Sequence, residues 1–412
     1  MSQPSSGPYF KWGSFSYGTP PQPQPASQIV VGLILVVILA LIGIAIWARM
    51  SPPASSSGTS ASTTAAAIGA GVSGFQSGPS VEGFEQAALS DENKTLQNLQ
   101  PLTIKQAAYM GGNKMDAVEG IKNAFIAGVR SLVLQIDFLD AKNAGDYAAP
   151  GIPTLLYRDD NGLLLSTNGA DLAKTMESIA TYPFRPEVPN NDKPVILYLH
   201  LNRAPNAVTH PKDYLDYLSQ IAKTLAPLAP NHLGMMPFGS FNRQKNESLL
   251  FRTPISQLGG KFIILCNADT SMFQQSNSLG YGTYDPKEDL DFWVNARVYL
   301  QNSSDKIGIT GSPTSNTTPS ATIVALSDVL ARSSFGKETL GIYVIALPSL
   351  TENPTPEDLK TALDVAGVVV PLDLFSTDLS TIRPLTNQWS KKSFRAKPAA
   401  LCTLIPALKT GS

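Results

Sequence analysis

The sequence predicts an α/β protein built on a single (β/α)₈ barrel of the TIM type, preceded by one transmembrane helix and a disordered stalk. Short runs rich in Val, Ile and Leu alternate with amphipathic segments from about residue 97 onward, as βα units do. An uncharged apolar run lies at 29–47, and a stretch rich in Ser, Ala and Gly follows it. The roughly 310 residues of the alternating part suffice for seven or eight βα units of one barrel.

The composition excludes several classes of protein. Of 412 residues, 43% are hydrophobic and only 15% are charged, against about 25% in typical soluble domains. With 31 basic and 32 acidic residues, the chain lacks the positive field that extensive nucleic-acid binding requires, so we expect no nucleic-acid partner. Cys266 and Cys402, the only two cysteines, exclude a disulfide scaffold and a multi-cysteine metal site. Whether these two form a pair stays open.

The first 84 residues divide into three segments. Residues 1–28, rich in aromatic residues, Pro and Gly, predict a disordered tail. Residues 29–49 predict a transmembrane helix, because their uncharged run would be about 28 Å long, close to the thickness of the hydrocarbon core of a bilayer. Residues 50–84 predict a flexible linker. We therefore expect a single-pass membrane protein whose residues 29–49 contact the lipid bilayer.

Two questions about this anchor follow from the same residues. A cleaved signal peptide is the alternative, but the run is longer than such peptides have, and no basic cluster precedes it. Only Lys11 and Arg49 flank the run, so the positive-inside rule barely discriminates between orientations. The side of the membrane that carries the barrel stays open.

Residues 85–412 form the predicted barrel domain. Three of its segments read as amphipathic helices: 116–128, 210–225 and 354–367. Gly128 ends the first, while Pro356 and Gly367 bound the last. The predicted strands, buried and parallel by their composition, are 102–109, 131–139, 153–158, 194–201, 261–266, 341–348 and 368–375.

Polar side chains at the carboxyl ends of these strands are the candidate functional residues, because a barrel of this kind carries its site there. Strand alternation separates Gln135 and Asp137 from the apolar face of 131–139. It separates Tyr198 and His200 from the apolar face of 194–201 in the same way. We expect these four side chains to point into the mouth of the barrel, with Arg158 at the end of a third strand.

Several segments of this domain, in order, are similar to pieces of a known family. DAVEGIKNAFIAGVRSLVLQIDFLD (116–140) is similar to its helix and acidic strand, and TPISQLGGKFIILC (253–266) to a later strand. GVVVPLDLFSTD (367–378) and SFRAKPAAL (393–401) are similar to its closing segments. The domain thus resembles the catalytic barrel of phosphatidylinositol-specific phospholipase C, of the PLC-like phosphodiesterase superfamily, as a degenerate member.

The resemblance implies a phosphodiesterase chemistry and a set of positions for it. One His would deprotonate the inositol hydroxyl, a second would protonate the leaving glycerol oxygen, and calcium would stabilise the developing charge. The first His position falls on Gln106 and the second on Arg158. The calcium-ligand positions fall on Ala107, Gln135, Asp137 and His200, and two phosphate-facing lysine positions fall on Leu265 and Asn267.

These replacements predict that the implied mechanism does not operate. Gln106 does not titrate, and Arg158 stays protonated near neutral pH. One carboxylate, Asp137, is a poor cage for calcium, which takes six or more oxygen ligands. We therefore expect no cofactor, although calcium is consistent with the resemblance.

Three functional hypotheses follow. The first is a non-catalytic, membrane-anchored barrel that binds a phosphate-bearing or anionic lipid head group through Arg158 and Tyr198, or serves as a structural membrane component. The second is an active phosphoric diester hydrolase with a rearranged site and His200 as its acid–base group. The third is a surface adhesion module. Arg158 could instead form a structural ion pair with Asp137, Asp159 or Asp160, and His200 could be a hydrogen-bonded core residue.

The C-terminal segment is basic. No acid follows Asp378, and the cations after it are Arg383, Lys391, Lys392, Arg395, Lys397 and Lys409. Clustered cations near a bilayer attract anionic lipid, although a solvated closing segment is the alternative interpretation.

Overall fold

The computed structural model describes residues 89–139, 150–234, 247–300, 319–375, 379–390 and 392–404. All of them belong to one of the two structural units of the chain, Ser57–Ser412. The predicted tail, transmembrane helix and linker, at 1–28, 29–49 and 50–84, lie outside the described residues. Within the described ranges, no helix is both long and apolar enough to cross a membrane.

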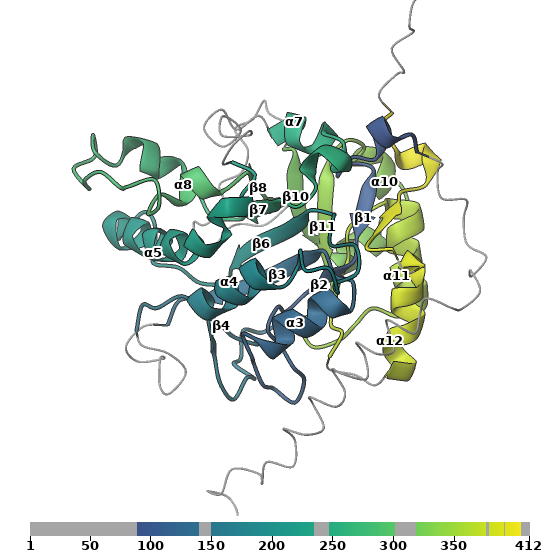
Figure 1. Ribbon diagram of the computed structural model, residues 1–412, viewed down its shortest axis with the longest axis horizontal. Coiled ribbons are helices and arrows are strands. Elements are labelled where there is room, and N and C mark those ends of the chain that lie inside the picture. The colour runs from purple at the N-terminus through teal and green to yellow at the C-terminus, as the bar shows by residue number, and fades with distance from the viewer. Residues whose placement is uncertain are drawn as a thin grey trace, which may run out of the picture. The chain divides into compact units, whose positions relative to one another are not determined.

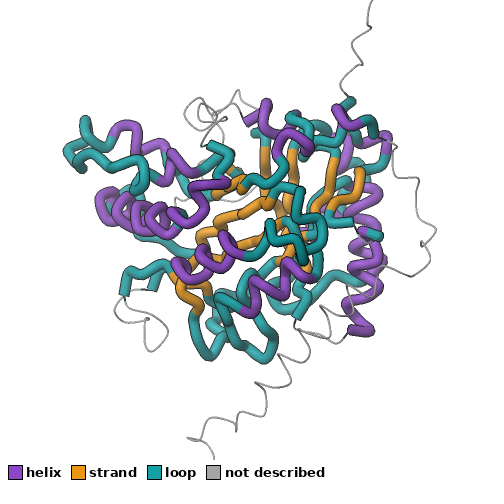
Figure 2. The backbone as a smooth tube through the Cα atoms, in the orientation of Figure 1, coloured by secondary structure: helices purple, strands orange, loops and turns teal. Residues whose placement is uncertain are grey.

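In the described part of the chain, eight parallel strands form a closed ring, with β8 and β9 together counting as one of them (Figures 1 and 2). Each strand pairs with the next one along the chain, and the last, β12, pairs with β2. The bridge between Ile345 and Val369 joins β11 to the residues entering β12. The strands are β2 (Thr103–Ile104), β3 (Ser131–Asp137), β6 (Val195–Leu201), β7 (Phe262–Cys266), β8 (Ala296–Arg297) continued by β9 (Tyr299–Leu300), β10 (Ala321–Ala325), β11 (Tyr343–Leu347) and β12 (Pro371–Leu372). The predicted barrel is confirmed by these pairings.

Helices surround the ring of strands (Figure 1). They are α3 (Glu119–Ile126), α4 (Leu172–Thr181), α5 (Pro211–Thr224), α7 (Glu247–Arg252), α8 (Leu290–Trp293), α9 (Leu326–Leu330), α10 (Phe335–Glu338), α11 (Pro356–Thr361) and α12 (Leu379–Thr386). The predicted helices appear as α3, α5 and α11, the last extended by a π-helical turn at Ala362–Ala366.

The helix boundaries follow the signals in the sequence. Gly128 and Gly367 have φ values of +84° and +67°, which glycine adopts without strain. Pro356 occupies the first position of α11, and the Thr355 hydroxyl accepts a hydrogen bond from the Asp358 amide at 3.1 Å.

Strand alternation divides the buried apolar residues into two cores. An outer core between strands and helices takes Leu132, Leu134 and Ile136 from β3. An inner core fills the barrel with Val133 and Tyr198 and with residues from β7, β10 and β11. The predicted faces of β3 and β6 are thereby confirmed.

The prediction that 153–158 is a parallel barrel strand is wrong. β4 (Thr154–Leu155) pairs antiparallel with the end of β3 and with β5 (Ala170–Asp171). The chain turns back after β3 instead of crossing over through a helix, and apolar content alone does not distinguish the two cases. The barrel strands β8, β9 and β10 were not predicted. β8 and β9 have two residues each, whereas β10 is as long as β7 and its apolar run was missed. A further antiparallel pair, β1 (Leu99–Pro101) with β13 (Phe394–Ala396), lies outside the ring.

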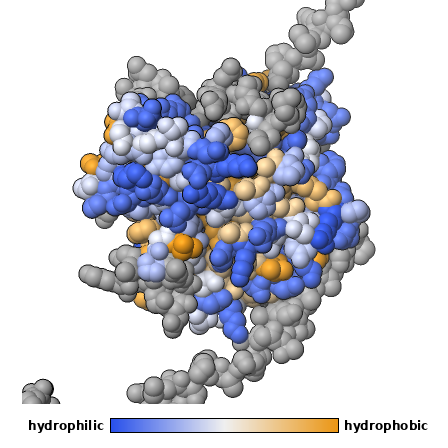
Figure 3. Space-filling model, turned by 60° about the vertical axis from the view of Figure 1, so that its left-hand side comes forward, coloured by the Kyte–Doolittle hydropathy of each residue, from blue (hydrophilic) through white to orange (hydrophobic). Residues whose placement is uncertain are grey.

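Cys266 is buried on β7 and Cys402 is half-buried, and the two are thiols that form no disulfide. On the face that Figure 3 shows, hydrophilic residues dominate and hydrophobic residues gather in a band near the centre.

Candidate functional site at the barrel mouth

The carboxyl ends of the strands, here called the mouth, carry inward-facing polar side chains. Gln135 and Asp137 lie in the carboxyl-terminal part of β3, and His200 lies opposite Gln135 on β6. Lys105 follows β2, and Asp373 follows β12 between two residues of the outer core. Lys105, Gln135, Asp137 and Asp373 are each less than 4% exposed. The mouth is therefore lined by polar groups whose bonding partners decide what they can do.

Asp137 and Arg158 form a buried ion pair. The Arg158 Nε donates to the Asp137 carboxylate, and its Nη1 donates to the Gly162 carbonyl at 2.9 Å. Asp137 is fully buried and Arg158 is 7% exposed. A second cation approaches, since the Nε of Arg203 lies 3.9 Å from the other oxygen of Asp137. Of the three acids considered as partners of Arg158, Asp137 is the one that the structure pairs with it.

The two glutamines of the predicted site hold backbone groups. Gln106 is buried, and its Nε2 donates to the Leu350 carbonyl at 3.3 Å. Gln135 Nε2 donates to the Lys105 carbonyl at 3.1 Å, which ties β3 to β2. The amide of Ala107 donates to the Val133 carbonyl at 3.1 Å. Gln135 and Ala107 thus join β2 to β3 at the mouth, and Gln106 joins the end of β2 to the segment after β11.

Tyr198 and His200 form a hydrogen-bonded pair, 2.9 Å from the hydroxyl to Nδ1. Burial lowers the pKa of His200 to about 4 and raises that of Tyr198 well above its usual range, so both are neutral at pH 7. Among the described residues, no other acceptor lies within bonding distance of the Tyr198 hydroxyl, which is buried. The hydroxyl therefore donates to Nδ1, and the imidazole carries its proton on Nε2. His200 thus presents an N–H donor on its other nitrogen, not a base.

Lys105 is a mouth residue that the sequence analysis missed. Its Nζ donates to the carbonyls of Ser349 and Glu352, both at 2.8 Å. Burial lowers the pKa of Lys105 to about 8, opposed by the nearby charge of Asp373. A charged residue in the inward register of an apolar strand was the signal available in the sequence.

Residues 349–353, here called the strap, cross one side of the mouth. Asp160 accepts hydrogen bonds from the Ser349 hydroxyl at 2.6 Å and from the Leu350 amide at 2.7 Å. The side chain of Asn353 exchanges two hydrogen bonds, each 2.7 Å, with the backbone of Asp373. The Lys105 ammonium and the Asp160 carboxylate therefore form these hydrogen bonds with the strap, inside the protein.

The histidines do not form a catalytic pair. The chain has three. His232 is buried, with its Nε2 2.7 Å from the Trp293 carbonyl, and its backbone pairs with the start of β7 at the opposite end of the barrel. His210 is exposed at the start of α5, with its Nδ1 2.8 Å from the Thr209 hydroxyl. His200 is the one imidazole in the inward register of a barrel strand at the mouth.

The residues at the positions implied for calcium do not fit the ion. Asp137, the one carboxylate among them, is neutralised by Arg158, and Ala107 offers no side-chain ligand. His200 is bonded to Tyr198, and its other nitrogen carries a proton. In the described ranges, no group of three or more His, Cys, Asp or Glu side chains is placed to hold a metal. Calcium needs six or more hard oxygen ligands, which these residues do not supply.

Comparisons with known proteins give structural matches only. A scan against protein families finds no match, and a search of curated proteins finds none. The barrel is similar to solved phospholipase C structures. PLC21 from L. pealei is 14% identical with a TM-score of 0.46, over 76% of this chain and 39% of that one.

Two bacterial structures are similar over most of their own length. A calcium-dependent phosphoinositol-specific phospholipase C from Pseudomonas sp. is 12% identical with a TM-score of 0.41, over 74% of this chain and 96% of that one. A calcium-dependent phosphatidylinositol-specific phospholipase C from Streptomyces antibioticus is 12% identical with a TM-score of 0.42, over 74% and 100%.

Proposed function

We propose that this chain is a single-pass membrane protein whose PLC-like barrel does not hydrolyse phosphodiesters and instead binds the anionic head group of a lipid. The observation that carries the proposal is the buried Asp137–Arg158 pair. It leaves a fixed, neutralised ion pair where the resemblance implies an acid–base group and a metal ligand.

The absence of proton transfer follows from the protonation states at the mouth. Hydrolysis needs one group that accepts a proton and another that donates one. Gln106 has no acidic or basic proton to exchange, the Arg158 guanidinium is held in an ion pair with Asp137, and His200 carries its proton on the nitrogen that does not bond Tyr198. The two groups that the mechanism needs are therefore not supplied by these residues.

Binding is supported by the donors that remain accessible beside β6. The Arg203 side chain is 43% exposed and lies beside the buried Asp137. His200 is partly exposed and offers its Nε2–H. A guanidinium with a neighbouring N–H suits a phosphate or carboxylate. Arg158 and Tyr198, which were predicted to bind the head group, are both buried. In the proposal they position the accessible donors: Arg158 pairs with Asp137 beside Arg203, and Tyr198 bonds to His200.

The experiment combines turnover and binding on the full chain in detergent. We expect no hydrolysis of phosphatidylinositol, glycerophosphodiesters or sphingomyelin, with or without calcium. Arg203→Ala should weaken binding of an anionic head group about tenfold or more, the order of magnitude of a charge-assisted bond. Arg252→Ala, which removes an exposed arginine of α7, is the matched control and should have no effect.

A second candidate is an active phosphodiesterase with a rearranged site. One observation favours it: Lys105, with a pKa of about 8, titrates near neutral pH at the mouth. Turnover that is lost in His200→Ala or in Lys105→Met would establish this candidate and refute the first.

Membrane anchoring is a separate part of the proposal, supported by the uncharged run within 29–49. Extraction of membranes with alkaline carbonate tests it. We expect the full chain to stay in the membrane pellet, and release into the supernatant would contradict the anchor.

A further inference from the structure

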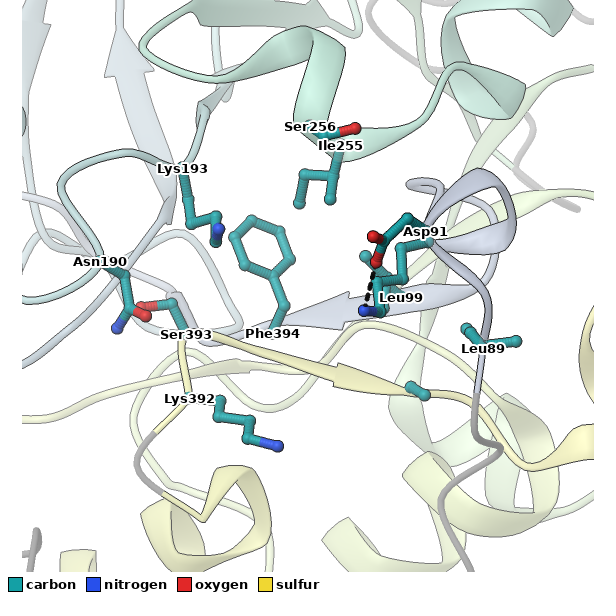
Figure 4. A pocket seen from close by; sticks show the side chains of 12 residues that line it. Leu89, Asp91, Leu99, Asn190, Lys193, Ile255, Ser256, Lys392, Ser393 and Phe394 are labelled. Atoms are coloured by element: carbon teal, nitrogen blue, oxygen red, sulfur yellow. Dashed lines mark hydrogen bonds and ion pairs between the residues drawn. The ribbon is translucent and has the colours of Figure 1, made fainter.

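A groove with a volume of about 810 Å³ lies at the end of the barrel opposite the mouth (Figure 4). It is formed by β1 and β13 together with the segments that precede β6 and β7. These segments lead into the amino ends of parallel strands, so the groove is remote from the mouth residues. Neither the candidate site nor the proposed function uses it.

The floor of the groove is apolar. Leu99 and Ile255 are 6% and 7% exposed, and Phe394 is half-buried against the inner core. Figure 4 shows the Phe394 ring extending into the groove between Lys193 and Leu99. The exposed apolar surface of the floor is therefore mainly that of Phe394, and a hydrocarbon chain laid against it would remove this surface from water, which favours binding.

The rim of the groove is cationic. The Lys94 and Lys193 side chains are 47% and 40% exposed, and each bonds one neighbouring acid, Asp91 or Asp192, at 2.6 Å. Lys392 is exposed, and no carboxylate of the described residues lies within ion-pairing distance of it. Exposed ion pairs contribute little stability, so a ligand anion can replace those acids.

A buried cation adds to the positive charge at this rim. Arg130 is fully buried, and its Nη2 donates to the Pro189 carbonyl at 2.6 Å, one residue before the groove residue Asn190. Arg130 and the three lysines thus face two carboxylates, Asp91 and Asp192. The surplus of two positive charges makes the groove complementary to an anion.

The point where the chain enters the barrel indicates the source of that anion. Leu89, the first described residue, lines the groove. The linker that the sequence predicts between the anchor at 29–49 and Leu89 would span on the order of 35 Å as a random coil. The groove therefore lies where the chain that leads to the predicted anchor joins the barrel, provided that the proposed anchoring holds.

We propose that the groove binds one anionic phospholipid of the membrane, with an acyl chain on Leu99, Ile255 and Phe394 and its anionic head group at Lys193 and Lys392. This inference rests on the anchoring part of the proposed function. It adds a lipid site at the opposite end of the barrel from the mouth.

Photo-crosslinking in lipid nanodiscs tests this site with the full chain. The probes are phosphatidylserine and phosphatidylcholine carrying the same diazirine acyl chain, and cross-linked peptides are identified by mass spectrometry. We expect cross-links to peptides containing Ile255 or Phe394, several-fold stronger with phosphatidylserine. Lys193→Gln with Lys392→Gln should lower this yield by about fivefold for each lysine removed. Lys174→Gln, an exposed lysine of α4, is the control and should leave the yield unchanged.

Cross-links within 29–49 serve as an internal standard that separates the two proposals. If they form while the groove gives none, or gives equal yields with both probes, the groove inference is refuted and the anchor stands. If the groove is labelled in a charge-dependent way but 29–49 is not, the site stands and the anchoring is refuted. Since Lys392 is exposed and Lys193 is partly exposed, an unchanged melting temperature should confirm that the variants fold.

Discussion

At the barrel mouth, the charge of Asp137 is balanced inside the protein. The Arg158 guanidinium is held from both sides, by this carboxylate and by the Gly162 carbonyl. A buried pair of this kind adds little net stability, yet removing one partner leaves an uncompensated buried charge. Asp137 and Arg158 are therefore held together as a buried pair at the end of the barrel.

This pair gives a prediction about stability. Arg158→Met should lower the free energy of unfolding by about 3–5 kcal/mol, measured by urea denaturation. Adding Asp137→Leu should recover much of that loss, because it removes the unpaired charge. Arg252→Met, at an exposed arginine, should change it by less than about 0.5 kcal/mol. Additive losses in the double variant would show that the two side chains do not act as a pair.

The pKa of His200 gives a prediction about pH. Burial lowers this pKa from 6.5 to about 4, so the unfolded chain takes up a proton below pH 6.5 while the folded chain does not. Stability should therefore fall by up to about 1.4 kcal/mol per pH unit as the pH drops from 6.5 to 5. His232, with a pKa also lowered to about 4, adds a similar slope.

Denaturant unfolding at several pH values measures this slope. The variant His200→Gln should lose the part of the slope that His200 contributes and retain the part that His232 contributes. An identical pH dependence in the variant and the parent chain would mean that His200 is not held neutral in the fold.

At the scale of elements, helix α3 determines where the mouth residues after β2 lie. Gly120 in α3 packs against the backbone of Ala108, which itself has a φ of +69°. A Cβ added at Gly120 would lie 2.8 Å from Cα and C of Ala108. The helix can approach the segment that carries Gln106 only because it has no side chain at this point.

Gly120→Ala should therefore reverse the usual effect of such a change. In a solvated helix the substitution stabilises by about 1 kcal/mol, but here we expect a loss of about 1–3 kcal/mol from overpacking. Thermal or urea unfolding shows whether the substitution raises or lowers the free energy of unfolding. Lys122→Ala, at a partly exposed position of the same helix, should change the free energy of unfolding by less than about 0.5 kcal/mol. A stabilised Gly120→Ala chain would contradict the close approach.

At the scale of the whole molecule, the barrel holds its two cysteines apart as thiols. Cys266 is buried in the outer core on β7, whereas Cys402 is half-buried and burial raises the pKa of its thiol. Access to Cys266 therefore requires opening of the barrel, while Cys402 needs only local motion.

Titration with a thiol reagent tests this difference. We expect one slowly reacting thiol in the native chain and both thiols in denaturant, without added reductant. Cys402→Ser should abolish the native reaction, and reducing agent should not shift the melting temperature. If no thiol reacts in denaturant until reductant is added, the two cysteines form a disulfide.

Part of the mouth could be predicted because it depends on local rules. The alternation of side chains in β3 and β6 follows from strand geometry, so the inward positions of Gln135, Asp137 and His200 were accessible from the sequence. The bonds that decide their chemistry were not. Lys105 meets Ser349 across 244 positions of the chain, and no local pattern encodes that contact.

The sequence by itself determined the alternation of strands and helices, their glycine and proline boundaries and the inward faces of the main strands, because periodicity and capping act over a few residues. Only the tertiary structure decided that Asp137 neutralises Arg158, that the strap engages Lys105, and that 153–158 turns back antiparallel. It also placed a lysine-rimmed groove beside the entering chain. The strap contact and the groove join segments distant in sequence that meet when the ring of strands closes. The other two features depend on the antiparallel return of the chain from β3 to β4.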